Sequence, residues 1–154
     1  MSYEEAANAS FPLRSTYVLA RLTRVVQRLL EEMLTSHSLS LPQFTVLAVL
    51  LRRPGLSNAQ LARRAYIAPQ SMQEVLRVLE DRDLIRRTPA PENQRILRAS
   101  LTATGKRLAV RADRDAARIE DAMLAGLSNA GRVQFVKSLR QCVASLGGGL
   151  KTPA

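Results

Sequence analysis

The chain has 154 residues, a length that suits one domain with its own hydrophobic core, and one cysteine, Cys142, excludes an internal disulfide. It carries 23 Lys and Arg against 13 Asp and Glu, so the net charge is +10. This charge favours a polyanionic partner, of which nucleic acid is the commonest, although an arginine-rich chain can also reflect genomic base composition. A single histidine, His37, argues against a metal site, and we expect neither metal nor cofactor.

The start of the chain, MSYEEAANAS, is acidic and polar and lacks the pattern of a secretory signal. The longest nearly apolar run, residues 44–51, is far shorter than the roughly 18 residues that span a bilayer. We therefore expect a cytoplasmic protein with no membrane partner.

Residues 13–36 contain neither Pro nor Gly and predict a long first helix. Its apolar residues recur at helical spacing and cover an unusually wide face: Val18, Leu22, Val25, Leu29 and Met33, with Leu19, Val26, Leu30 and Leu34 beside them. A helix of this kind usually contacts two neighbours. The second neighbour is either another copy of the chain or the core of a monomer, and the pattern leaves both open.

Two capping boxes predict where the next helices begin. SLPQ (40–43) opens a helix over about 41–52, and SNAQ (57–60) opens a short helix over about 58–65. In each box the serine accepts from an amide of the first turn while the glutamine reaches back to the serine amide.

Pro69 suits the first position of a fourth helix, where its missing N–H has no effect. The apolar side of this helix carries Met72, Val75, Leu76 and Leu79. The segment therefore predicts a helix, a four-residue turn and a second helix with a polar outer face.

From residue 84 to 101 the apolar residues alternate with polar ones, which predicts a two-stranded hairpin with its turn at PAPENQ. Thr102 is a candidate cap for a further helix that ends near Gly126, and Ser128 is a candidate cap for the last helix. The apolar residues of that helix follow a spacing that supports pairing with another helix.

Helix, helix, outward-facing helix and hairpin make the winged helix-turn-helix arrangement, which suits DNA because one helix enters a major groove about 12 Å wide. Residues 52–98 contain ten Arg and five acidic residues, which is half of the basic excess. Three stretches, LSLPQFTVLAVL (39–50), LSNAQLARRAYIAPQSMQEVLRVLEDRDLIRR (56–87) and RILRASLTATG (95–105), resemble the MarR family of winged helix-turn-helix transcriptional regulators.

The resemblance runs from about Leu13 to Leu146 and implies a mainly α (α+β) fold. It implies one MarR-like domain over 1–154, with dimerisation helices at about 11–37 and 103–147 and a DNA-binding lobe at about 40–101. The function implied is that of a homodimeric, ligand-responsive repressor that binds double-stranded DNA at a pseudo-palindromic operator. Such a protein acts in the cytoplasm of a bacterial or archaeal cell, associated with the nucleoid.

The resemblance also implies the residues that face DNA. The recognition helix presents Pro69, Gln70, Ser71, Gln73, Glu74 and Arg77. The amides of Gln70 and Gln73 are able to pair with adenine, and Ser71 can serve a phosphate or a base. Ser57 is either a phosphate contact or simply a helix cap.

The hairpin contributes the remaining candidate contacts. Arg95 matches the wing arginine that the family inserts into the minor groove, although Asn93 stands where an Asp is usual. Arg86, Arg87 and Arg98 are either phosphate contacts or solvated strand residues.

Three further positions depart from the family pattern. Tyr66 stands where a turn Gly is common, and Ala68 stands where a capping Ser or Asp is common. Asp83 replaces a Gly, but Asp tolerates the left-handed conformation and lets the helix stop.

By the same resemblance, a small aromatic or phenolic effector binds between the dimerisation helices and the DNA-binding lobe. The candidate lining residues are Tyr17, Val18, His37, Phe44 and Leu47, for each of which core packing is the alternative. For Cys142 a buried structural role is favoured over thiol sensing.

Other functions are less well supported. An enzyme is disfavoured because the only His and the only Cys lie about a hundred residues apart. A winged-helix protein-interaction module would expose apolar residues on the fourth helix, which is polar here. An architectural DNA binder without an operator remains an alternative that the sequence does not separate from a regulator.

Overall fold

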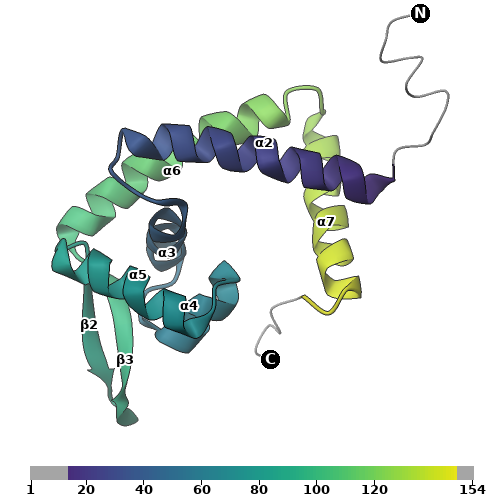
Figure 1. The fold of residues 1–154 in the computed structure, drawn as a ribbon. Helices are drawn as coiled ribbons and strands as arrows, with labels where there is room; N and C mark the ends of the chain where they lie inside the picture. The colour runs from purple at the N-terminus through teal and green to yellow at the C-terminus, as the bar shows by residue number, and fades with distance from the viewer. Residues whose placement is uncertain (1–13, 149–154) are drawn as a thin grey trace, which may run out of the picture.

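The computed structural model describes residues 14–148, which form helices of up to 21 residues around a small sheet (Figure 1). The elements in chain order are α2 Ser15–Thr35, α3 Leu41–Arg52, β1 Leu56–Ser57, α4 Asn58–Ala65, α5 Pro69–Asp81, β2 Ile85–Ala90, β3 Asn93–Leu101, α6 Ala103–Met123 and α7 Asn129–Ser145. This is the mainly helical winged helix-turn-helix fold that the sequence predicts.

Both capping boxes are present. The Ser40 hydroxyl accepts from the Gln43 amide at 3.3 Å, and the Gln43 side chain accepts from the Ser40 amide at 3.0 Å. Ser57 and Gln60 repeat the arrangement at 3.3 Å and 2.9 Å. The predicted starts of α3 and α4 are therefore confirmed, because each depends only on residues within one turn.

The fourth helix begins at Pro69 as predicted, and Ala68 provides no side-chain cap. The turn before it, 66–68, has three residues rather than the four expected, because Tyr66 ends α4 in the left-handed conformation with φ of 53°. Asp83 also has a positive φ, 52°, and the chain turns there from α5 into β2.

The sheet has three antiparallel strands in the order β1-β3-β2. The predicted hairpin is β2 and β3, in which Ile85 pairs with Leu101 and a bulge follows Pro89. The two-residue strand β1 was not expected; Leu56 pairs with Ala99 and ties the start of α4 to the hairpin.

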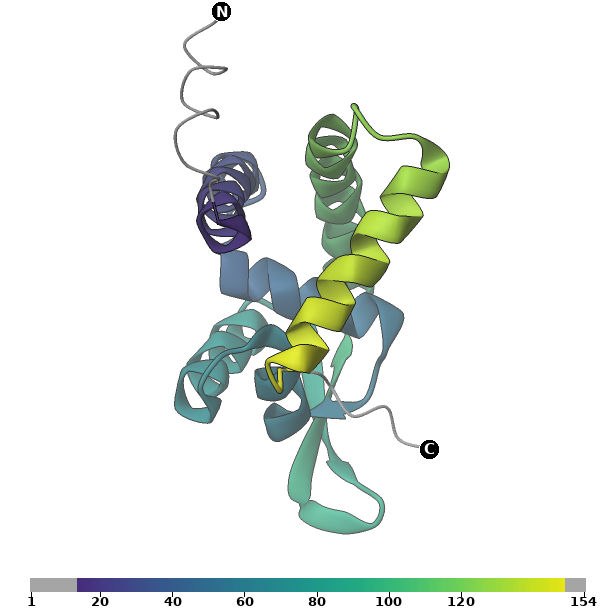
Figure 2. The same ribbon diagram turned by 90° about the vertical axis from the view of Figure 1, so that its right-hand side faces the viewer.

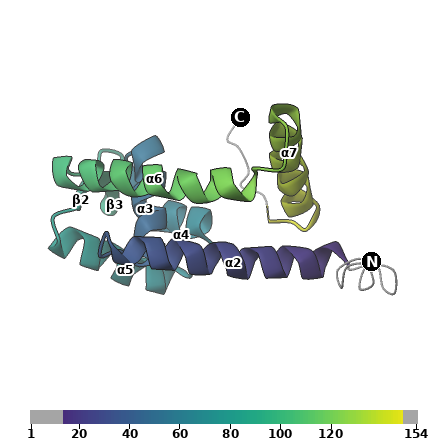
Figure 3. The same cartoon turned by 90° about the horizontal axis from the view of Figure 1, so that it is seen from above.

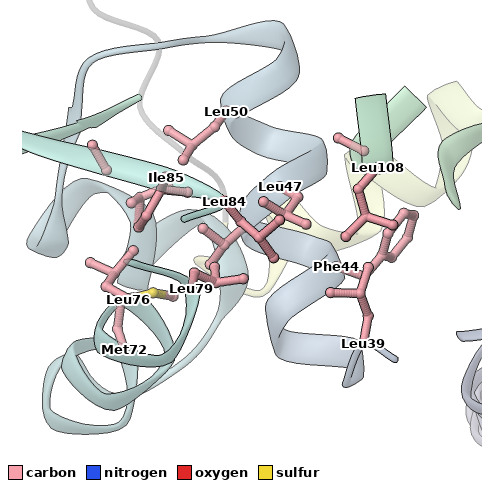
Figure 4. Packing of buried hydrophobic residues seen from close by; sticks show 14 of the residues in the cluster. Leu39, Phe44, Leu47, Leu50, Met72, Leu76, Leu79, Leu84, Ile85 and Leu108 are labelled. Atoms are coloured by element: carbon pink, nitrogen blue, oxygen red, sulfur yellow. The ribbon is translucent and has the colours of Figure 1, made fainter. Parts of the chain in front are cut away.

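The core lies where α3 meets α5, the base of the hairpin and α6 (Figure 4). Leu47 of α3 and Leu79 of α5 are fully buried, and Ile85 and Leu108 close the cluster. This packing holds the buried side of α5 against the lobe and leaves its other side in solvent.

The junction between hairpin and α6 is unusually close. The Thr102 amide donates to the Leu84 carbonyl at 3.1 Å, and the Thr102 hydroxyl donates to the Asp83 carbonyl at 2.6 Å. The same hydroxyl accepts from the Gly105 amide at 3.0 Å and caps α6, as predicted. A side chain at Gly105 would place its Cβ 1.8 Å from the Leu84 carbonyl oxygen, so only glycine permits this approach.

Helices α2 and α6 run side by side away from the lobe, and α7 crosses beside their far ends (Figures 1 and 3). The first half of α2 is exposed, with Tyr17 at 65% and Val18 at 52% of full exposure. The second half of the apolar face packs against the core at Leu34, whereas the first half is left uncovered in the single chain, which favours a second copy of the chain as its neighbour.

No residue of α7 is buried in the single chain, and Val133 and Val143 are exposed. Cys142 is exposed as well, so the expected buried position is wrong for the single chain, because α7 packs too loosely to cover it. The end of α7 approaches the turn before α5 (Figure 2), where the Tyr66 hydroxyl donates to the Gly148 carbonyl at 2.5 Å.

None of the helices in residues 14–148 combines the length and hydropathy needed to cross a membrane.

Candidate nucleic-acid interface

The outer face of α5 is polar and exposed, while its inner face is buried against the rest of the lobe. All six candidate residues of this helix lie on the exposed face: Pro69, Gln70, Ser71, Gln73, Glu74 and Arg77. Met72 and Leu79 on the opposite face are fully buried. Within residues 14–148 the hairpin contacts this outer side at Gln73, whose side-chain oxygen accepts from Arg87 at 3.4 Å, and the six side chains remain exposed enough to enter a groove.

The first turn of α5 has an unusual feature. Pro69 has no amide hydrogen, Ala68 offers no capping oxygen, and the Met72 amide is the first to bond within the helix, to the Ala68 carbonyl at 2.9 Å. The amides of Gln70 and Ser71 therefore have no side-chain cap, and they point from the positive end of the helix dipole. An anion such as a phosphate suits this position.

A groove of about 320 Å³ runs between the start of α4, the outer side of α5 and the hairpin. Its walls bring together candidate residues from distant parts of the sequence, namely Ser57, Gln73, Arg87 and Arg95. Ser57 is the N-cap of α4, so its hydroxyl is already engaged with the Gln60 amide. Capping is therefore its established role in the free protein.

Arg77 is held by two carboxylates of its own helix. It donates to Glu74 at 2.6 and 3.0 Å and to Asp81 at 2.8 Å. The hydrogen bond with Arg77 holds the pKa of Glu74 below its usual value and raises the pKa of Arg77. This side chain lies on the DNA-facing side but must exchange its partners to contact a phosphate.

Arg87 and Arg98 are also paired. Arg87 donates to Glu80 from its backbone amide at 3.2 Å and from Nε at 2.8 Å, and Arg98 pairs with Glu92. The hydrogen bond from Arg87 holds the pKa of Glu80 below its usual value. Only about a fifth of the Arg87 side chain is exposed, so it joins α5 to the hairpin.

Arg86 and Arg95 differ from these three arginines. Both are exposed, and neither has a carboxylate partner among the ion pairs of residues 14–148. The Asn93 side chain accepts from the backbone amide of Arg95 at 3.0 Å. Asn93 therefore orders the backbone of the hairpin tip and leaves the Arg95 guanidinium free.

A second cavity, of about 340 Å³, lies between α2, α3 and α6. Most of its lining is apolar and includes Val26, Leu30, Phe44, Ala48, Ile119 and Met123. Three charged residues, Arg52, Asp113 and Glu120, complete it. We refer to this space as the α2/α3/α6 cavity.

Of the five residues expected to line an effector pocket, Phe44 alone lines the α2/α3/α6 cavity. Leu47 is in the core, and Tyr17 and Val18 are exposed at the start of α2. The ring of His37 lies 2.8 Å from the Asp115 carboxylate of α6, outside the cavity. Within residues 14–148 no three His, Cys, Asp or Glu side chains group into a metal site.

Comparison with known proteins identifies the fold. The family model "MarR family" matches residues 39–97. The HTH-type transcriptional repressor Rv2887 of Mycobacterium tuberculosis is 37% identical over 125 residues, which are 81% of this chain and 90% of that repressor. This chain belongs to the MarR family.

Two solved structures of Rv2887 match this MarR family chain closely. The complex of Rv2887 with DNA superposes with a TM-score of 0.67 at 35% identity and covers 86% of this chain and 98% of that one. The complex of Rv2887 with salicylic acid gives a TM-score of 0.67 at 36% identity, covering 86% and 97%. These relatives are transcriptional regulators rather than enzymes.

One residue of this MarR family chain was missed at the sequence level. The Asn58 side-chain amide donates to the Pro69 carbonyl at 3.2 Å, so the first residue of α4 is bonded to the first residue of α5. Asn58 also lines the groove beside Ser57. Asn58 lies inside the capping box 57–60, but that pattern assigns roles only to Ser57 and Gln60. No local sequence pattern shows that the start of α5 lies within hydrogen-bonding distance of the Asn58 side chain.

Proposed function

We propose that this protein is a ligand-responsive transcriptional repressor that binds a pseudo-palindromic operator in double-stranded DNA as a homodimer. The observation that carries the proposal is the polar outer face of α5, which is exposed beside the hairpin. The structure of the relative Rv2887 in complex with DNA has the same fold. A protein-interaction module would instead present apolar residues on this face.

The candidate contacts divide by chemistry. Gln70, Ser71 and Gln73 present hydrogen-bonding groups that can read base edges, and the free amides at the start of α5 suit a phosphate. Arg86 and Arg95 can bind the DNA phosphate backbone or the minor groove without first breaking an ion pair.

The unpartnered helices support a homodimer. Apolar residues of α2, such as Val18, and of α7, such as Val133 and Val143, are exposed in the single chain. Burial of these side chains against a second copy would stabilise a dimer, at about 25 cal/mol for each Å² of apolar surface removed from water. The regions about 11–37 and 103–147 would then form the dimerisation part of a single domain and 40–101 its DNA-binding lobe; residues 11–13 lie outside the described part.

The α2/α3/α6 cavity supports a response to a small effector. It joins the dimerisation helices to α3 of the lobe, and the relative Rv2887 has been solved with salicylic acid. An effector with different affinity for two arrangements of the dimer would shift the balance between DNA-bound and free protein. Such a repressor would act on the nucleoid in the cytoplasm.

The test is a gel shift over a range of salt concentrations that compares the upstream region of the protein's own gene with a scrambled sequence of equal length. A repressor with an operator should prefer one site by a factor of about a thousand or more. An architectural binder would show equal affinities with the same salt slope, and that result would contradict the proposal. Sedimentation equilibrium of the free protein checks the dimer.

A further inference from the structure

The two glutamines on the outer face of α5 differ in their surroundings. Gln70 and Gln73 are both exposed and lie three residues apart, which places them on the same side of the helix. The Gln73 side-chain oxygen lies 3.4 Å from a terminal nitrogen of Arg87 in β2. The Gln70 side chain takes part in no hydrogen bond found within residues 14–148. Only Gln73 therefore has a protein group that sets the orientation of its amide.

Arg87 is itself held in place by Glu80 of α5. Its guanidinium donates to the Glu80 carboxylate from Nε at 2.8 Å and from one terminal nitrogen at 2.5 Å, and its backbone amide donates to the same carboxylate at 3.2 Å. Only 19% of the Arg87 side chain is exposed. These bonds fix the guanidinium and leave its other terminal nitrogen in contact with Gln73.

The chemistry of Arg87 decides which end of the Gln73 amide faces it. A guanidinium has only N–H donors, whereas a glutamine amide has an acceptor oxygen and a donor NH2 group. The opposite orientation of the amide would place donors against donors. At 3.4 Å the contact is longer than an ideal hydrogen bond, but the attraction between the oxygen and the cation still sets the orientation. The NH2 group of Gln73 is therefore turned away from Arg87.

This NH2 group remains available for a ligand, since it has no partner within residues 14–148. The adjacent carboxylate in the sequence, Glu74, is bonded to Arg77 at 2.6 and 3.0 Å. Gln73 also lines the groove between α4, α5 and the hairpin, together with Arg87. A base edge that approaches Gln73 would meet N–H donors and not the amide oxygen.

Donors alone select a different base from a glutamine that can turn freely. In the major groove guanine presents two acceptors, N7 and O6, whereas adenine presents the acceptor N7 beside its donor amino group. A glutamine that pairs with adenine must accept from that amino group with its oxygen and donate to N7 with its NH2 group. With the oxygen turned to Arg87, adenine loses one of these two hydrogen bonds, and guanine becomes the better match.

We propose that Arg87 is a positioning residue for base recognition, which turns the Gln73 amide so that this side chain reads guanine instead of adenine. The proposal rests on the proposed function, because it requires the outer face of α5 to read an operator. It differs from the sequence-based expectation for Gln73 and keeps that expectation for Gln70, whose amide can turn to suit adenine.

The experiment selects bound sites from a library of random-sequence duplexes with the full chain. Gln73→Ala first identifies the position that Gln73 reads, because preference is lost there, and Gln70→Ala identifies the position of Gln70 in the same way. In the wild type we expect guanine over adenine at the Gln73 position by about fivefold or more, the lower end of the discrimination that a well-formed base contact gives.

Arg87→Lys separates positioning from a general structural role. A lysine ammonium keeps the charge beside Glu80, but it is a compact point charge and lacks the second terminal nitrogen that contacts Gln73. We expect the ratio of guanine to adenine at the Gln73 position to fall by about fivefold, with the preference at the Gln70 position unchanged as the internal control. Gln73→Lys carries only donors and should keep guanine. Circular dichroism checks that each variant is folded.

Adenine at the Gln73 position in the wild type, or no position that Gln73→Ala relaxes, would overturn the proposal. This wild-type result tests the amide orientation without any change at Arg87. An unchanged ratio in Arg87→Lys would overturn the positioning role, and a change at both glutamine positions would do the same because the whole of α5 would then have moved. Loss of all sequence preference in the wild type would instead contradict the repressor function itself, so the two failures can be distinguished.

Discussion

Replacing Gly105 by alanine should destabilise the protein, although alanine is the better helix former. The new Cβ would lie 1.8 Å from the Leu84 carbonyl oxygen and 2.7 Å from its carbonyl carbon. Both are backbone atoms of the segment that joins α5 to β2, so neither can rotate away as a side chain would. The first turn of α6 must therefore move away from Leu84.

This movement disturbs a specific set of bonds. The Thr102 amide and hydroxyl both donate to the segment Asp83 to Leu84, at 3.1 and 2.6 Å, and Leu108 packs into the core one turn beyond Gly105. Loss of two hydrogen bonds costs about 1 kcal/mol each, and loosened packing costs about another 1 to 2 kcal/mol. Alanine regains about 1 kcal/mol of helix propensity. The expected net loss is about 2 to 3 kcal/mol.

The measurement is urea denaturation followed by circular dichroism at one protein concentration, since dimerisation would make stability concentration-dependent. Gly131→Ala is the matched control. Gly131 likewise occupies the third helical position after a hydroxyl cap, here Ser128, and its Cβ would meet only the Ser128 hydroxyl at 3.3 Å and a Leu127 side-chain carbon at 3.5 Å. Equal or greater stability of Gly105→Ala relative to wild type would refute the argument from close approach.

Three further predictions concern α5 and the hairpin. Gln73→Ala should reduce the preference among DNA sequences more than the mean affinity, and a selection of bound sites from random DNA measures this; equal loss on every sequence would make Gln73 a backbone contact. Arg95→Ala should weaken binding and reduce the salt slope by about one unit, whereas an unchanged slope in salt-dependent gel shifts would remove Arg95 from the interface. Glu80→Gln should cost about 1 kcal/mol at pH 7, a modest value because the Glu80 pair with Arg87 is partly screened by solvent. Since Arg87 lowers the folded-state pKa of Glu80 from its ordinary 4.5, the stabilisation is complete above that value and is lost as the pH falls through the lower folded-state value. Urea titrations at pH 7 and pH 3 should therefore show a difference between the Glu80→Gln variant and wild type that shrinks at pH 3, and an equal difference at both would contradict the assignment.

Features with short-range causes were predictable from the sequence. The starts of α3, α4, α5, α6 and α7 all follow from a cap or a proline within one turn, and the structure places each at the expected residue. The hairpin followed from alternation of apolar and polar residues. The polar outer face of α5 followed from the spacing of Met72, Leu76 and Leu79 on its other side.

Features that depend on distant residues were not predictable. The pairing of Arg87 with Glu80 requires the hairpin to fold back on α5, and nothing local distinguishes Arg87 from the unpaired Arg86. Of the five residues expected to line an effector pocket, only Phe44 lines the α2/α3/α6 cavity, because the resemblance gave helices but not their rotation about their axes. Strand β1 is too short for alternation to be seen.

The exposure of Cys142 was missed for a related reason. Its position beside an apolar seam suggested burial, but that seam meets no partner within a single chain. The sequence showed that α7 has an apolar face that would be buried, but it did not show whether residues of the same chain or of a second chain bury it.

Helix α6 links the α2/α3/α6 cavity to the hairpin through a continuous rod. Its first turn is clamped onto the carbonyls of Asp83 and Leu84, and its later turns carry Asp113 and Glu120 along the cavity wall. A straight helix transmits a tilt along its length with little bending, at 1.5 Å of rise per residue. A molecule that binds between α6 and α2 and moves them apart would therefore also move the hairpin and the end of α5. The close contact at Gly105 would couple a small displacement at the cavity to a displacement of the DNA-binding lobe.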